Sequence, residues 1–131
     1  MLNYGYAIVY PRVLQAILRA GLNPGIGVLH TFQKDKPTLA FDLIEIFRSQ
    51  AVDRVVISMV QKREPIGMDK GLLNESTKKL LIQNILERLN KYEKFRSKEV
   101  PFISIIGIQA KEITSFIMNQ NKSFKPYIFK W

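Results

Sequence analysis

The chain has 131 residues, enough for one domain, and contains no cysteine, which excludes disulfides, zinc–thiolate sites and thiol nucleophiles. Lys and Arg number 20 against 11 Asp and Glu, giving a formal net charge of +9. Such a balance is typical of proteins that bind polyanions, although lysine-rich proteins without such a partner also occur.

No segment of the chain has the pattern of a membrane span or an export signal. The apolar run at residues 100–108 has nine residues, fewer than the roughly 20 that span a bilayer. The N-terminus lacks the basic region and small-residue cleavage site of a secretory signal. We therefore expect a cytoplasmic protein with no membrane partner.

The first predicted element is a helix over residues 2–20. Its apolar residues recur at the spacing of one helical face, and Gly21 follows as a C-cap. Pro11 should kink this helix or mark its first turn. Residues 21–30 then read as a loop, because their three glycines and one proline stop a helix and let the backbone pass close to other groups.

A long central helix is predicted for residues 38–62, which hold 14 apolar residues between positions 38 and 60 and neither Gly nor Pro. Residues 63–74 interrupt the pattern. Another helix is predicted over residues 75–96, capped by Asn74 or Ser76, with apolar residues on one face and lysines on the other.

A fourth helix is predicted over residues 100–121, with Pro101 at its start. The tail at 122–131 alternates lysines with aromatic residues. Its aromatic rings could stack on nucleic-acid bases, but docking against the core is the favoured interpretation. With hardly any strand pattern, the sequence predicts an all-α fold in a single helical domain around residues 38–62.

An acidic stripe on the central helix raises the question of function. At about 100° per residue, Asp42, Glu45, Ser49 and Asp53 fall within a sector of about 80°, and most of the remaining surface is apolar. Unpaired buried carboxylates are too costly to stay ionised. The stripe is therefore a narrow solvent window, with Glu45 paired to Arg48 or Ser49, or it faces a cleft.

The second alternative is a metal site. A divalent cation offsets clustered carboxylate charge, and one imidazole with carboxylates suits Mg²⁺ or Mn²⁺ better than zinc. His30 is the chain's single histidine and lies 12 and 15 residues before Asp42 and Glu45. This spacing is no general motif, so the residues alone leave both alternatives open.

Three stretches in order carry a resemblance: LNYGYAIVY, AGLNPGIGVLH and LAFDLIEIFRSQAVDRVV. Together they resemble the C-terminal helical domain of the CRISPR-associated adaptation integrases, also called CRISPR-associated protein 1. The resemblance continues more weakly through MDKGLLNESTKKLLI, IGIQAKEI and FKPYIFKW, so that it covers almost the whole chain.

The resemblance implies a metal-dependent DNA endonuclease and integrase that inserts pieces of foreign DNA into a CRISPR repeat array. It implies His30 and Glu45 as catalytic residues and ligands of Mg²⁺ or Mn²⁺, with Asp42 as an orienting residue or alternate ligand. Arg48 matches the arginine of the family's Asp-Leu-x-Glu-x-Phe-Arg motif. Candidate contacts to DNA phosphates are Arg48, Lys34, Lys78 and Lys79.

The resemblance also implies partners and missing parts. Family members carry an N-terminal β-rich domain and a glutamate-bearing helix upstream of LNYGY. We therefore expect residues 1–131 to be a C-terminal catalytic domain, truncated at the N-terminus and inactive alone. The implied partners are DNA, CRISPR-associated protein 2 and, in the full-length protein, a second copy.

Two other classes of protein remain possible. A non-catalytic helical DNA-binding or scaffold module would also explain the charge and the basic tail. An unrelated helical metal hydrolase would need a further ligand from Asp35, Asp53 or Asp69. Dependence on a divalent metal separates an enzyme from a binding module.

Overall fold

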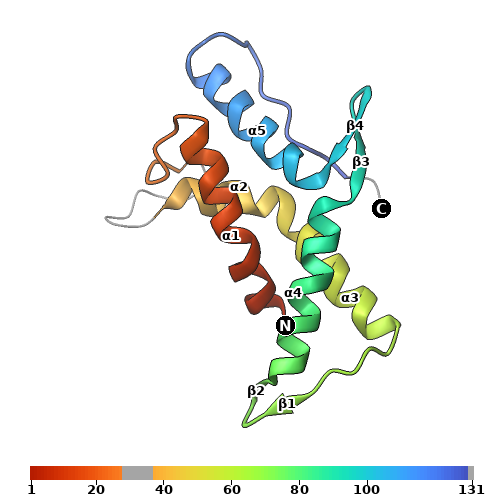
Figure 1. Ribbon diagram of the computed structural model, residues 1–131. Helices are drawn as coiled ribbons and strands as arrows, with labels where there is room; N and C mark the ends of the chain where they lie inside the picture. The colour runs from red at the N-terminus through yellow and green to blue at the C-terminus, as the bar shows by residue number, and fades with distance from the viewer. Residues whose placement is uncertain (28–36, 130–131) are drawn as a thin grey trace.

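The computed structural model describes residues 1–27 and 37–129 (Figure 1). The helices are α1 (Leu2–Arg19), α2 (Thr38–Arg48), α3 (Arg54–Gln61), α4 (Glu75–Asn90) and α5 (Phe102–Ile117), and a π-helical turn, η1 (Ser49–Asp53), joins α2 to α3. Within these ranges no helix combines the length and apolar character needed to cross a bilayer.

The predicted central helix is confirmed in position but not in regularity. Figure 1 shows α2, η1 and α3 running as one continuous rod behind α1 and α4. η1 contacts both α1 and α4, and its Ala51 and Val52 are fully buried. A π-helical turn adds a residue to one helical turn, so it rotates the side chains of α3 relative to those of α2.

Residues spaced four apart on the packing helices form the core. On α1 the buried residues are Gly5, Val9, Val13 and Ile17. On α4 the apolar buried residues are Leu81, Ile85 and Leu89. Such spacing places each set on one helical face, and burying these faces supplies the main stabilisation of the fold.

Two helix ends follow the sequence prediction. Gly21 has φ +76°, and the backbone N–H groups of Gly21 and Leu22 donate to the carbonyls of Leu18 and Ile17 at 3.0 and 3.1 Å. These are the bonds of a Schellman cap. At the start of α4, Asn74 is the cap, because its Oδ1 accepts from the N–H of Thr77 at 2.9 Å.

The prediction of an all-α fold is wrong. Two antiparallel hairpins lie in the described part of the chain: β1 (Met68–Asp69) with β2 (Leu72–Leu73), and β3 (Tyr92–Phe95) with β4 (Lys98–Pro101). The first closes on Lys70 and Gly71, both with positive φ, the backbone of a tight two-residue turn. The fold is mixed α/β, with small sheets at two corners of a helical body (Figure 1).

The predicted helix over residues 75–96 is accordingly too long, since α4 ends at Asn90 and β3 begins at Tyr92. In the second hairpin Tyr92 pairs with Pro101, and Phe95 pairs with Lys98 across the turn. The backbone N–H of Phe102 donates to the Lys91 carbonyl at 2.9 Å. This bond ties the start of α5 to the end of α4.

The aromatic tail docks on the core, as the favoured interpretation predicted. The Tyr127 ring stacks on Phe47 with centroids 6.0 Å apart and also contacts Phe95 and Phe102. Its backbone N–H donates to Gln109 Oε1 at 2.7 Å. At least one ring that was a candidate for base stacking, Tyr127, therefore packs against the core.

A first prediction concerns Gly5, whose face of α1 lies against η1. A Cβ at this position would overlap Cγ1 of Val52 and lie 3.2 Å from Cδ1 of Ile85. We expect Gly5→Ala to lower the free energy of unfolding by about 1–3 kcal/mol, because overpacking outweighs the better helix propensity of Ala. Urea denaturation monitored by circular dichroism measures the change.

The matched control is Gly107→Ala on α5, where a Cβ meets nothing within 4 Å. This variant should raise stability by about 0.5–1 kcal/mol through helix propensity alone. Adding Val52→Ala to Gly5→Ala should return part of the lost stability, since it removes the overlapping methyl group. Equal stability of the Gly5→Ala and Gly107→Ala chains would contradict the close packing of α1 on η1.

Candidate functional site

A groove between α1 and α2 contains Glu45, one of the predicted catalytic residues. It has a volume of ≈ 580 Å³ and is lined by Tyr6, Ala7, Tyr10, Phe41, Ile44, Glu45 and Arg48. The rings of Tyr10 and Phe41 approach to 5.6 Å between centroids and join its two walls. The groove is mostly apolar, with Glu45 and Arg48 as its charged residues.

Glu45 lies on the exposed face of α2. Its side chain is 41% exposed, and its Oε2 accepts from Nε of Arg48 at 2.9 Å. This is the intrahelical pairing that the sequence left open for the acidic stripe. An ion pair so exposed contributes little stability, so a cation that approached Glu45 would have only a weak competitor in Arg48.

Asp42 and Asp53, the other carboxylates of the stripe, have different surroundings. Asp42 is only 7% exposed and already takes part in an interaction. Asp53 accepts a hydrogen bond from the hydroxyl of Tyr6 at 2.6 Å. The stripe is therefore neither a uniform solvent window nor a uniform cleft, because its exposure falls from Glu45 to Asp42.

The loop residues that precede His30 in the sequence contact the first turn of α2. The Thr38 hydroxyl donates to the Gly25 carbonyl at 2.7 Å and accepts from the N–H of Gly27 at 2.8 Å. The N–H of Leu39 donates to the Pro24 carbonyl at 2.9 Å. Thus residues 24–27 fold back over the start of the helix that carries Asp42 and Glu45.

His30, Lys34 and Asp35 lie outside the described residues, so the predicted approach of His30 to Glu45 stays a prediction. Over residues 1–27 and 37–129, no three His, Asp or Glu side chains gather as a metal site. Glu45 and Asp42 are one helical turn apart, and both supply oxygen donors of the kind that Mg²⁺ and Mn²⁺ prefer. The described carboxylates therefore fit part of a divalent-cation site.

The lysines predicted to contact DNA lie on another element. Lys78, in the first turn of α4, pairs with Glu75 at 2.7 Å between Nζ and Oε1. Lys79 lines a groove of ≈ 880 Å³ between α3 and α4. Neither lysine lines the groove that contains Glu45, so the structure does not bring them together with Arg48 around one hollow.

Sequence reasoning missed the two tyrosines of the α1/α2 groove. The hydrogen bond to Asp53 raises the pKa of Tyr6 above its ordinary value, with burial and the Asp53 charge adding to the effect. Burial alone raises the pKa of Tyr10. Their spacing of four residues, which puts them on one face of α1, is the signal that could have placed them on one groove wall.

A prediction follows for alkaline pH. The pKa of Tyr6 is higher in the folded chain, so the stability it contributes is complete below its unfolded value of about 10 and is lost as pH rises through the folded value. We expect Tyr6→Phe to make the fall in melting temperature above about pH 10 less steep. The exposed Tyr92→Phe is the control, and equal slopes for both variants would contradict the Tyr6–Asp53 hydrogen bond.

Comparisons with known proteins identify the family of the chain. Residues 1–87 match the family model for the CRISPR associated protein Cas1. The CRISPR-associated endonuclease Cas1 1 of Archaeoglobus fulgidus is 34% identical over 137 residues, covering 100% of this chain and 39% of the relative. The protein of the same name from Francisella tularensis subsp. novicida is 35% identical over 131 residues and is 40% covered.

Solved structures give the same result. A casposase bound to integration product superposes with a TM-score of 0.86 at 26% identity, covering 99% of this chain and 41% of that one. A Cas1 protein from Thermotoga maritima has a TM-score of 0.83 at 24% identity, with 90% and 39% covered, and shows the fold alone. The chain spans about two fifths of the length of the curated relatives it matches.

Proposed function

The chain belongs to the Cas1 family of CRISPR-associated proteins, and from this premise we propose that it carries the metal-binding face of a DNA endonuclease and integrase. The observation that carries the proposal is the position of Glu45. This residue is an exposed carboxylate on the wall of an open groove, and the first turn of its helix is hydrogen-bonded to residues 24–27, which precede His30 in the sequence. The proposed cofactor is Mg²⁺ or Mn²⁺.

In this proposal Glu45 and His30 would hold the cation, and Asp42, buried one turn earlier, would orient Glu45. The bound cation supplies charge stabilisation for phosphoryl transfer and an activated oxygen nucleophile. Arg48, whose pair with Glu45 is exposed, would bind a DNA phosphate, which its planar guanidinium can hold with two hydrogen bonds. The groove's apolar wall, with Tyr10 and Phe41, excludes water from one side of the reacting phosphate.

The wider proposal concerns a protein of the length of the relatives, of which this chain matches about two fifths. It inserts foreign DNA fragments into a CRISPR repeat array in the cytoplasm, as a dimer that works with CRISPR-associated protein 2. Residues 1–131 form its catalytic domain. The similarity to a casposase bound to integration product supports the strand-transfer part of this proposal.

A second candidate function is a non-catalytic DNA-binding or scaffold module. The formal charge of +9 favours it, because charge alone gives salt-sensitive binding to DNA without any chemistry. The two candidates differ in metal dependence. A binding module needs no divalent cation and no carboxylate at position 45.

The test uses residues 1–131 joined to the part of the Archaeoglobus fulgidus relative that the chain does not match. We expect the chimera to cleave branched DNA, and to join DNA 3′ ends to a duplex, with Mn²⁺ or Mg²⁺ but not with chelator. Residues 1–131 alone should show neither reaction. Equal cleavage with and without the divalent cation would reject the metal-dependent function, and DNA binding without cleavage would favour the module.

A further inference from the structure

A third groove, between α1 and α5, is lined by cations and differs in this from the groove that contains Glu45. Its volume is ≈ 420 Å³, and its lining includes Arg12 and Arg19 of α1 and Lys111 of α5. Small residues, Ala16, Ala20 and Gly107, lie between these cations. A Cβ at Gly107 would meet nothing within 4 Å, so open space lies above this part of α5.

Among residues 1–27 and 37–129, no carboxylate lines this groove. The lining contains no Asp or Glu, and in the described ranges no ion pair involves any of the three cations. Nη1 of Arg12 donates to the Ile8 carbonyl at 2.5 Å, which fixes the guanidinium along α1 and leaves its other N–H groups for a ligand. By contrast, Glu64 and Glu87 line the larger groove between α3 and α4.

The two grooves that α1 borders lie on different sides of that helix. At about 100° per residue, Tyr6, Ala7 and Tyr10 point roughly opposite to the face that carries Arg12 and Arg19. The buried stripe of α1 lies between them. A ligand in the cationic groove is therefore remote from the carboxylate of Glu45.

The residues that line the groove indicate which kind of ligand it can bind. It contains no aromatic side chain on which an unstacked base could lie. Arg12 and Arg19 are seven residues apart, about 10 Å along the helix axis, a length over which one strand of a duplex presents about three phosphates. Small residues between the cations let a sugar–phosphate backbone approach the helices closely.

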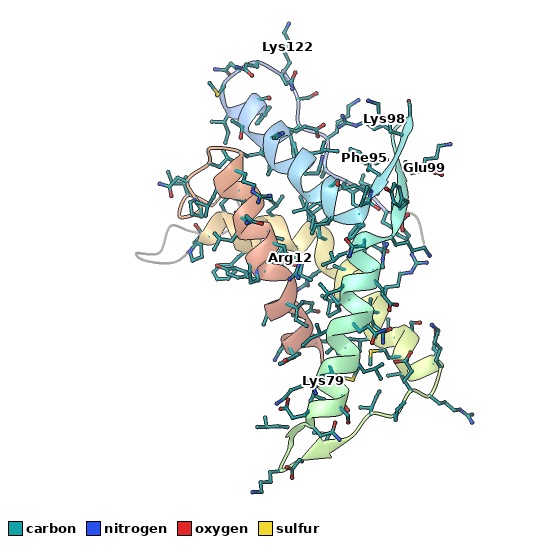
Figure 2. All side chains as sticks on the ribbon, viewed as in Figure 1. Arg12, Lys79, Phe95, Lys98, Glu99 and Lys122 are labelled. Carbon is teal, nitrogen blue, oxygen red and sulfur yellow. The ribbon has the colours of Figure 1, made fainter. Side chains whose placement is uncertain are left out.

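We propose that the groove between α1 and α5 binds the phosphate backbone of duplex DNA, with Arg12, Arg19 and Lys111 as its contacts. The site holds a duplex segment away from the Glu45 groove, without reading its sequence. Lys98, labelled with Arg12 in Figure 2, lines an adjoining hollow that shares Ile108 with this groove and so extends the cationic surface toward β4. The choice of DNA as the polyanion rests on the proposed function.

The first experiment compares Gly107→Glu with Gly107→Gln in the 131-residue chain. Both side chains enter the same open space and differ in one charge. With a fluorescent DNA duplex in chelator, we expect Gly107→Glu to weaken binding about tenfold and Gly107→Gln to change it by less than about twofold. Equal affinities of the two variants would overturn the proposal.

The second experiment locates the DNA. The chain has no cysteine, so Ser104→Cys places a single photo-crosslinker in the groove, and Gln61→Cys places one on the end of α3, outside it. We expect several-fold more crosslinked duplex from position 104, and addition of Arg12→Gln and Arg19→Gln should remove that excess. Equal yields from positions 104 and 61 would overturn the proposal.

Competition experiments distinguish DNA from other ligands that carry phosphate. We expect unlabelled duplex to displace the bound DNA, whereas millimolar inorganic phosphate and vesicles with anionic lipid should not. If vesicles displace the duplex, and position 104 gives no crosslink to DNA, the groove binds anionic lipid instead. This result would overturn the proposal. Because these assays contain no divalent metal, they succeed or fail independently of the cleavage test on the chimera.

Discussion

Replacing Glu45 by Gln should lower metal-dependent DNA cleavage by the chimera at least about a thousandfold, because the loss of a metal ligand removes several kcal/mol of transition-state stabilisation. Gln keeps the shape and the exposed position of the side chain but not its charge. His30→Ala should cause a loss of the same order. Single-turnover rates at saturating Mn²⁺ measure both effects.

The variants around Glu45 give the controls. Asp42→Asn should cost only about 10–100-fold if Asp42 orients the ligands, and raised Mn²⁺ should not restore it fully. Glu99→Gln removes an exposed carboxylate of β4, labelled in Figure 2, and should leave the rate unchanged. Full activity of the Glu45→Gln chimera, with its helical circular dichroism intact, would refute the assignment of the metal site.

Mn²⁺ binding by residues 1–131 alone gives a second test of the proposed metal site at Glu45. Because Arg48 pairs with Glu45, a cation must displace it. We therefore expect Arg48→Gln to tighten weak Mn²⁺ binding to residues 1–131, and Glu45→Gln to abolish it. This opposite response of two neighbours on α2 distinguishes a metal site from general attraction of cations to surface acids.

The helix ends that could be predicted depend on local chemistry. Gly21 follows the last apolar residue of α1 and adopts the positive φ that a Schellman cap needs, and Asn74 supplies the side-chain oxygen that starts α4. Both signals involve residues within four positions of the helix end. Such signals are present in the sequence whatever the rest of the chain does.

The missed features depend on contacts between distant residues. β3 was assigned to a helix because its short, charged sequence continues the pattern of α4, and only pairing with β4 distinguishes it. The π-helical turn η1 has no sequence signal, since the apolar pattern continues through it. In the site, the acidic stripe did not distinguish the exposed Glu45 from the buried Asp42, and the bond from Tyr6 to Asp53 spans 47 residues.

The contact that holds η1 also comes from a distant residue, Arg88 of α4. Its Nε donates to the carbonyl of Gln50 within η1 at 3.0 Å, and its Nη1 donates to Glu93 at 2.8 Å. Its guanidinium lies over the Phe102 ring, 4.4 Å from the centroid. One 8% exposed side chain thus joins η1, α4, β3 and α5.

We expect Arg88→Met to lower the free energy of unfolding by about 3 kcal/mol, because it leaves the buried Gln50 carbonyl and the Glu93 carboxylate without their donor. The loss should not be larger. Among the described residues, Nη2 of Arg88 has no hydrogen-bond partner, and Glu93 is 21% exposed and can be partly hydrated once the pair is lost. Urea denaturation at neutral pH measures the change.

The matched control is Arg96→Met, which removes an ion pair to Glu112 from an arginine that is 56% exposed. It should cost less than about 1 kcal/mol, since exposed pairs are well solvated when broken. Adding Glu93→Gln to Arg88→Met should recover part of the loss by removing the unpaired charge, but not the part that belongs to the Gln50 carbonyl. If Arg88→Met were no more destabilising than Arg96→Met, the π-helical turn would be held by apolar packing of Ala51 and Val52 alone, and Arg88 would have no part in placing α2 relative to α3.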